Sequence, residues 1–254
     1  MLTLWVLAAV LLGLLVLESP PQLAPFALVP VLGSRNLVWS SIGGLIDLVW
    51  VIPLLVAIRS WHAARLDRSA LAFGFAAGSK QLVWPIAPFL AIWLWNDADG
   101  IDELRDTVTT TLSWGCVGFL SLNLPFIVLD PGAWAASVLT PIAGGTPLVH
   151  QGVGPTLLSV TGLYALPKAY FSLLLGLALV VGLVLYALNW ERVKWAAWVV
   201  PPAIFFWNYR SLLSYITYFL PVAYLTLLCA VDLRRTSRPT RLDIQEVIGR
   251  VAAL

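Results

Sequence analysis

One lysine stands inside a long apolar stretch, where a charged side chain is costly. Residues 69–95 are apolar nearly throughout, yet Lys80 and Gln81 lie in the middle, and Pro85 and Pro88 follow shortly after. A lysine in the centre of a lipid-facing helix costs about 2.5–3.5 kcal/mol on insertion scales, so such residues usually face protein or a watery cavity. Because proline breaks or kinks a helix, we interpret this stretch as a broken membrane element. Its cation would bind the phosphate or pyrophosphate of a lipid-linked substrate, unless the lysine side chain only extends to the interface.

A second charge could act from the preceding apolar segment. Asp47 lies in the sequence GGLIDLVW, at the start of residues 42–58. Its carboxylate either contacts a substrate or an ion, or it interacts with the positive N-terminal end of its own helix. An ion pair between Asp47 and Lys80 would also explain why both charges are tolerated among apolar residues.

Residues 130–155 are rich in glycine, proline and polar residues, and we expect a long loop there. Loops carry binding residues more often than core elements do. Trp134 could stack on a sugar or anchor at a membrane interface, and His150 is either a binding group or a solvated loop residue. Asp130 either contributes to the same site or caps a helix start.

Arg210 lies between two apolar segments and close to several tyrosines. Its guanidinium could bind an anionic headgroup, whereas tyrosines at such a place are ordinary membrane-interface residues. No residue is assigned as catalytic. The sequence has no phosphate-binding glycine loop, dinucleotide fingerprint, zinc-protease motif or paired-cysteine motif, so we predict neither a metal nor a cofactor. The candidate substrate-binding residues are Lys80, Gln81, Asp130, Trp134, His150, Arg210 and Asp47.

The composition is that of a membrane protein. Of the 254 residues 60% are hydrophobic and only 11% are charged, against about 25% charged residues in typical soluble domains. We therefore predict an all-α, polytopic integral membrane bundle with short or re-entrant broken helices. Residues 1–231 would form roughly seven to nine membrane segments, and residues 232–254 a basic cytoplasmic tail. The basic residues flank apolar segments and form no nucleic-acid-binding cluster.

The apolar runs predict the elements that position these residues. We expect spanning helices at residues 2–17, 42–58, 107–129, 168–188 and 211–231, and short pieces at residues 23–32, 86–95, 156–166 and 195–207. Thirteen tryptophans are consistent with rings at the two membrane interfaces.

The sides of the membrane follow from the basic residues. Residues 59–68 and the basic tail are both expected in the cytoplasm. Counting segments back from the tail places the acidic stretch 96–106 inside as well. These assignments agree only if residues 69–95 enter and return on the same side, as a hairpin that turns near Lys80. If this stretch spans once instead, residues 130–155 move to the cytoplasm.

Three stretches together resemble the multi-spanning GT-C glycosyltransferases, in particular the prokaryotic family 87 type. They are LAFGFAAGSKQLVWPIAPFLAIWL, the region from Asn36 to Asp47, and NLPFIVLDPGAW. A G-x-A-A-x-x-K segment followed by proline is common in that family, and Gly74, Ala76, Ala77 and Lys80 would match it. The resemblance covers residues 33–224.

The resemblance implies a membrane enzyme that moves a sugar, often mannose, from a polyprenyl-phosphate carrier to an acceptor at the outer face. Its partners would be the lipid-phosphate-linked sugar donor and membrane lipids. The family's N-terminal helices and their acidic loop have no counterpart here, since only Glu18 follows the first helix. The chain therefore resembles the C-terminal two-thirds of such an enzyme.

Three functions remain open on this basis. The first is the glycosyltransferase, or a part of one. The second is a non-catalytic subunit or scaffold that pairs with a companion membrane chain carrying the catalytic acid. The third is a small transporter or lipid translocator, because broken helices with charges near the middle of the membrane also occur in transporters.

Overall fold

A computed structural model describes residues 2–32, 48–143, 151–152, 154–161, 166–211 and 213–237 of the chain. Within these residues the protein is helical, apart from the two very short strands β1 (Gln151–Gly152) and β2 (Arg210–Ser211). The strands pair in parallel, with Gln151 opposite Arg210. The predicted all-α class is therefore confirmed.

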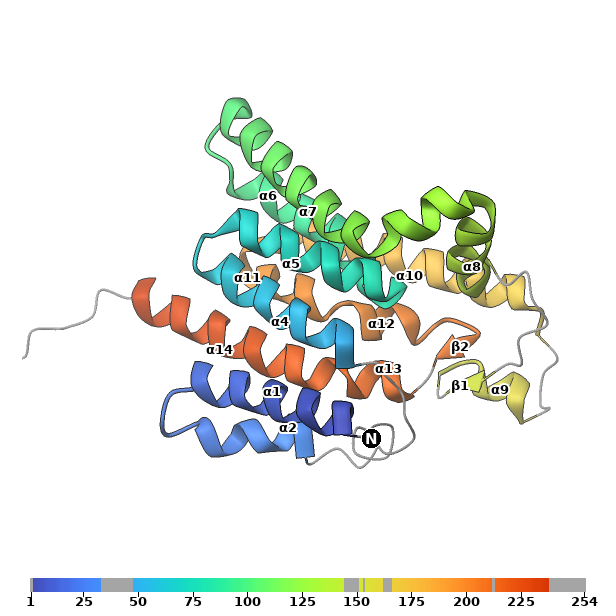
Figure 1. Cartoon of the computed structure of the whole chain (residues 1–254), viewed down its shortest axis with the longest axis horizontal. Helices are drawn as coiled ribbons and strands as arrows, with labels where there is room; N and C mark the ends of the chain where they lie inside the picture. The colour runs from blue at the N-terminus through green and yellow to red at the C-terminus, as the bar shows by residue number, and fades with distance from the viewer. Residues whose placement is uncertain are drawn as a thin grey trace, which may run out of the picture.

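Long helices alternate with short helical pieces along the chain. In order they are α1 (Leu2–Glu18), η1 (Ala24–Ala27), α2 (Leu28–Leu32), α4 (Leu48–His62), α5 (Leu66–Ser79), η2 (Gln81–Val83), α6 (Ile86–Asp97), α7 (Ile101–Leu129), α8 (Pro131–Ala143), α9 (Leu157–Val160), α10 (Lys168–Leu188), α11 (Trp190–Val193), η3 (Lys194–Val199), α12 (Pro201–Phe205), α13 (Leu213–Thr217) and α14 (Phe219–Ser237). The longer helices stack from α1 through α14 and α4 to α5 and α7 (Figure 1).

The stretch that contains Lys80 forms two helices, as predicted. α5 ends at Ser79, Lys80 is extended with φ −153° and ψ 127°, and α6 begins at Ile86 after the short η2. α6 then returns beside α5, because Leu94 near its end lines the same small cavity as Leu66 in the first turn of α5. The expected hairpin is thus the path of the chain, while its position in a membrane stays a prediction.

α5 and α7 run parallel and touch through glycines. A Cβ atom built on Gly74 would lie 2.1 Å from the carbonyl oxygen of Gly115, and one on Gly118 would lie 2.2 Å from that of Leu71. Small residues four apart allow helix backbones to approach this closely, and Gly78 follows Gly74 at that spacing. The glycines of the FGFAAG sequence therefore have a packing role.

α4 and α5 form an antiparallel helical hairpin that fixes the start of α5. The turn contains Ala64, whose φ of 57° is in the left-handed region. Across the pair, the buried Ser69 hydroxyl donates a hydrogen bond to the carbonyl oxygen of Ala57 at 2.8 Å. The buried hydroxyl group thus has a hydrogen-bond partner between two apolar helices, as most buried polar groups do.

Charged segments that the sequence predicts to be cytoplasmic lie together at one end of the bundle. Arg59 near the end of α4 forms an ion pair with Glu18 at the end of α1. Trp61, two residues further, lines a cavity with Glu103 in the first turn of α7. The same ring packs 5.6 Å from Trp198, in the η3 segment that follows the charged stretch 191–194. Lys80 lies at the opposite end, where α5 stops.

Several tryptophans are part of the protein core. The sequence predicts tryptophans at the two membrane interfaces. Trp50, Trp61, Trp93, Trp195 and Trp198 are all buried. Edge-to-face contacts join the last four, with ring centroids 5.3 Å apart for Trp61 and Trp93 and 5.0 Å apart for Trp93 and Trp195, while Trp50 packs on Tyr218 and Phe219. Their distribution along the chain does not reveal this, because an aromatic residue near a helix end suits either environment.

Three expected boundaries are wrong. The predicted loop 130–155 begins with the helix α8, because Asp130 caps it. The predicted soluble stretch 96–106 is partly helical, since α7 already begins at Ile101, with Asp102 and Glu103 in its first turn, where negative charge is favoured. The predicted helix 211–231 is divided into α13 and α14.

Two described helices are long and apolar enough to cross a membrane. They are residues Ile101–Leu129 and Ala169–Leu188, and only 11% of each apolar window is buried within the protein. The shorter apolar helices Val6–Glu18, Val49–His62 and Tyr215–Val231 fall below that length. The number of membrane segments predicted from the sequence stays a prediction.

Candidate functional site

The break after α5 is held against α8. Gln81, the first residue of η2, donates a hydrogen bond from Nε2 to the carbonyl oxygen of Val138 at 3.3 Å. Lys80 precedes it, with its side chain half-buried. Two helices that are distant in the sequence thus meet at this turn, and the lysine stands where they meet.

Asn123 joins the three helices at this end. It is 9% exposed, and its Nδ2 donates to the carbonyl oxygens of Gly78 and Phe119, both at 3.1 Å. Its Oδ1 accepts a hydrogen bond from Nε1 of Trp134 at 3.0 Å. One side chain of α7 therefore binds the last turn of α5 and the first turn of α8. Asn123 is not among the residues predicted from the sequence, although an amide inside an apolar helix is a signal that could identify it.

Asp130 has the capping role that was one of its two interpretations. Its Oδ1 accepts a hydrogen bond from the backbone nitrogen of Ala133 at 2.8 Å, while the residue itself is exposed. A side-chain acceptor at this position satisfies one of the free N–H groups of the first helical turn. Asp130 thereby orients α8 and, with it, Trp134.

We expect Asp130→Ala to destabilise the protein by about 1 kcal/mol, the usual effect of losing a helix cap. Asp130→Asn keeps an acceptor and should be nearly neutral. Thermal unfolding in detergent, followed by circular dichroism, measures the difference. An unchanged midpoint for Asp130→Ala would contradict the capping role.

Asn123→Ala should cost about 1–3 kcal/mol, because it leaves buried polar partners such as the Gly78 carbonyl without their hydrogen bonds. Asn96→Ala is the matched control: Asn96 is exposed, and within the described part of the chain its side chain bonds only to Ile92 O of its own helix, at 2.8 Å. Unfolding midpoints of the two variants test the prediction. Equal effects would show that Asn123 is an ordinary helix residue.

The remaining predicted residues are placed only in part. Asp47 and His150 lie outside the described residues. Arg210 is described by its backbone alone, in β2 opposite Gln151. Nearby, the buried hydroxyl of Thr156 donates to the carbonyl oxygen of Asn208 at 2.6 Å. The segment after His150 therefore packs on the segment before Arg210.

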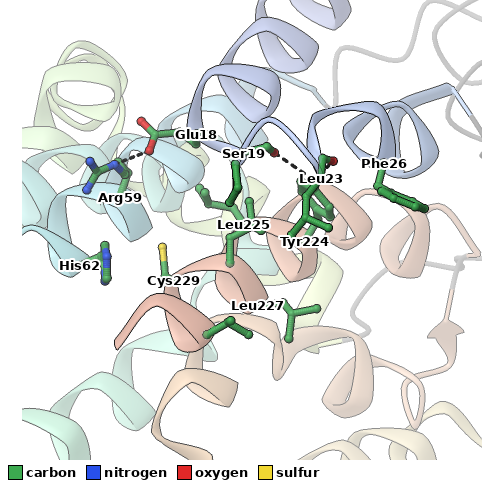
Figure 2. A pocket seen from close by; sticks show the side chains of 13 residues that line it. Glu18, Ser19, Leu23, Phe26, Arg59, His62, Tyr224, Leu225, Leu227 and Cys229 are labelled. Carbon is green, nitrogen blue, oxygen red and sulfur yellow. Dashed lines mark hydrogen bonds and ion pairs between the residues drawn. The ribbon is translucent and has the colours of Figure 1, made fainter. Parts of the chain in front are cut away.

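A cavity of about 500 Å³ lies at the charged end, between α1, η1, α4 and α14 (Figure 2). Glu18 and Arg59 form its polar edge, with Arg59 Nε 2.5 Å from Glu18 Oε2. The Tyr224 hydroxyl donates to the carbonyl oxygen of Leu23 at 2.9 Å and so ties α14 to the turn after α1. None of the residues predicted from the sequence to bind a substrate lines this cavity.

A second, almost wholly apolar groove of about 670 Å³ runs along α10. Leu177, Val181 and Leu185 line it from α10, and Ile204 lines it from α12. Gly182 lies in its floor, where an added Cβ would touch the rings and methyl groups of Phe89 and Ile204 at 3.4 Å. The groove extends the exposed apolar surface of α10.

Comparisons with protein-family models, with curated proteins and with solved structures found no match. The resemblance to GT-C glycosyltransferases thus stays a prediction.

Proposed function

We propose that the chain is a multi-pass integral membrane protein with its C-terminus in the cytoplasm. The long apolar helices α7 and α10 support this, because only 11% of each apolar window is covered by the rest of the protein. The core helix of a soluble protein would be mostly buried, and apolar surface of this extent is unfavourable in water. The gathering of charged segments at one end fits a cytoplasmic face.

We further propose that the opposite end binds the phosphate of a lipid-linked sugar and that the protein takes part in transferring this sugar at the outer face. The observation that carries this proposal is the break at Lys80, which places a cation between α5, α7 and α8. An extended residue between two apolar helices is tolerated in a membrane only where protein or a cavity surrounds it. Gln81 and Trp134 would contact the sugar or the acceptor from either side of the lysine.

A transfer assay tests this function directly. The protein would be reconstituted in lipid vesicles with labelled polyprenyl-phosphate mannose and a crude acceptor fraction. Label that moves to an acceptor in the presence of the protein, and not with empty vesicles, supports transfer. Absence of both transfer and donor binding would refute the proposal.

A second candidate is a donor-binding subunit without its own catalytic acid. It is favoured because Asp130, the one carboxylate that the described residues bring to the Lys80 end, caps a helix. In this case the protein binds the donor, transfers nothing alone, and co-purifies with a companion membrane chain. A monomer that transfers the sugar by itself would exclude this candidate.

A further inference from the structure

The cavity at the charged end combines an open ion pair with an apolar wall. Arg59 and Glu18 have side chains that are 45% and 33% exposed, and they contact each other through Arg59 Nε and Glu18 Oε2. Among the described residues, neither terminal nitrogen of Arg59 makes a further hydrogen bond. A guanidinium edge that remains available in this way suits a phosphate, and the carboxylate suits an ammonium group.

The apolar part of the cavity continues away from this pair. Leu23 and Phe26 line it from the segment around η1, and Leu225 lines it from α14 (Figure 2). Leu228 of α14 lines it as well. α14 runs toward the charged end, so these leucines lie deeper in the bundle than the residues that follow them. The cavity therefore combines a charged edge at the cytoplasmic end with an apolar wall from α14 and the segment around η1.

We propose that this cavity binds one phospholipid with a zwitterionic, phosphate–ammonium headgroup. The phosphate lies against Arg59, the ammonium group lies against Glu18, and an acyl chain follows the apolar wall. Two adjacent opposite charges match a zwitterion better than an anionic lipid, because Glu18 repels a headgroup that carries only negative charge. The proposal rests on the membrane placement given above and is independent of sugar transfer.

Native mass spectrometry of the detergent-purified protein tests the proposal after incubation with equal amounts of phosphatidylethanolamine and phosphatidylglycerol. We expect wild-type protein to retain phosphatidylethanolamine preferentially. Arg59→Gln should lower its occupancy at least ten-fold, and Glu18→Gln should shift the preference toward phosphatidylglycerol. Arg68→Gln removes an exposed arginine in the first turn of α5 that does not line the cavity, and it should change nothing.

Several outcomes would overturn the proposal. Equal retention of both lipids by the wild type would contradict the zwitterion preference. If Arg68→Gln lowers lipid retention as much as Arg59→Gln does, the lipid is held by general attraction to surface charge and not by this cavity. Displacement by soluble glycerophosphoethanolamine at equal concentration would identify a soluble ligand instead. Unchanged unfolding midpoints for the variants verify that the effects concern binding.

The same preparation separates this proposal from the proposed function. If alkaline carbonate extracts the protein from membranes, the membrane placement itself fails, and both proposals fail with it. If the protein stays in the membrane but binds lipids without selectivity, only the headgroup proposal fails.

Discussion

Replacing Lys80 by alanine is expected to weaken binding of a polyprenyl-phosphate donor by roughly 10–150-fold. A hydrogen bond to a charged group contributes about 1.5–3 kcal/mol, and each 1.4 kcal/mol corresponds to a factor of ten in the dissociation constant. The lysine stands at the extended break between α5 and η2, outside the glycine contacts that hold α5 on α7. The change should therefore appear in binding more than in stability.

Lys194→Ala provides the matched control for this experiment. Lys194 is also half-buried, but it lies at the charged end, with Nζ 5.3 Å from the centroid of the Trp190 ring. Its removal should leave donor binding unchanged. Lys80→Arg keeps the charge and should restore most of the affinity, because a guanidinium also binds phosphate.

Binding is measured with labelled polyprenyl phosphate in vesicles, so the test applies whether or not the chain transfers sugar alone. If Lys80→Ala binds the donor like the wild type and only unfolds more easily, the lysine has a structural role. The alternative interpretation of its side chain, an extension to the membrane interface, would then hold.

Individual helices such as α10 and the break at Lys80 can be predicted from the sequence, because each depends on residues that are close together in the chain. The apolar run of residues 168–188 defines α10 to the residue, and the prolines after Lys80 indicate that α5 cannot continue as one helix. The division of residues 211–231 is less visible, since Pro221 is compatible with the first turn of α14 and predicts no break by itself.

The contacts that assemble the candidate sites are not predictable in this way. Glu18 and Arg59 are 41 residues apart, and Asn123 meets Gly78 across 45 residues. Neither the periodicity nor the composition of the sequence predicts which helices become neighbours. The small residues of α5 are ambiguous for the same reason, since Gly74 fits a family motif and a helix-packing motif equally well until α7 is placed against it.

Gly74→Ala is expected to be the most destabilising single-methyl change in the described part of the protein. The new Cβ would lie 2.1 Å from the carbonyl oxygen of Gly115 and 2.9 Å from the backbone nitrogen of Phe119. Both atoms belong to the backbone of α7, so no side chain can rotate away, and the two helices must separate. Overpacking of this kind costs about 1–3 kcal/mol and occasionally more.

Gly118→Ala should have a similar effect, because its Cβ would meet the carbonyl oxygen of Leu71 at 2.2 Å. The double variant should cost less than the sum of the two, since helices that have already moved apart accommodate the second methyl group; contacting residues are commonly non-additive. Gly176→Ala is the control, as an added Cβ there meets nothing within 4 Å. It should stabilise α10 by about 0.5–1 kcal/mol through the better helix propensity of alanine.

Unfolding midpoints of the wild type and the four variants in one detergent, followed by circular dichroism, test these expectations. A separation of α5 from α7 also moves Gly78 away from Asn123, so Gly74→Ala should weaken donor binding at Lys80 as well. If Gly74→Ala and Gly176→Ala have equal midpoints, α5 and α7 do not pack through their glycines. The packing of α5 on α7 would then no longer explain why the chain break at Lys80 lies against α8, which directly follows α7.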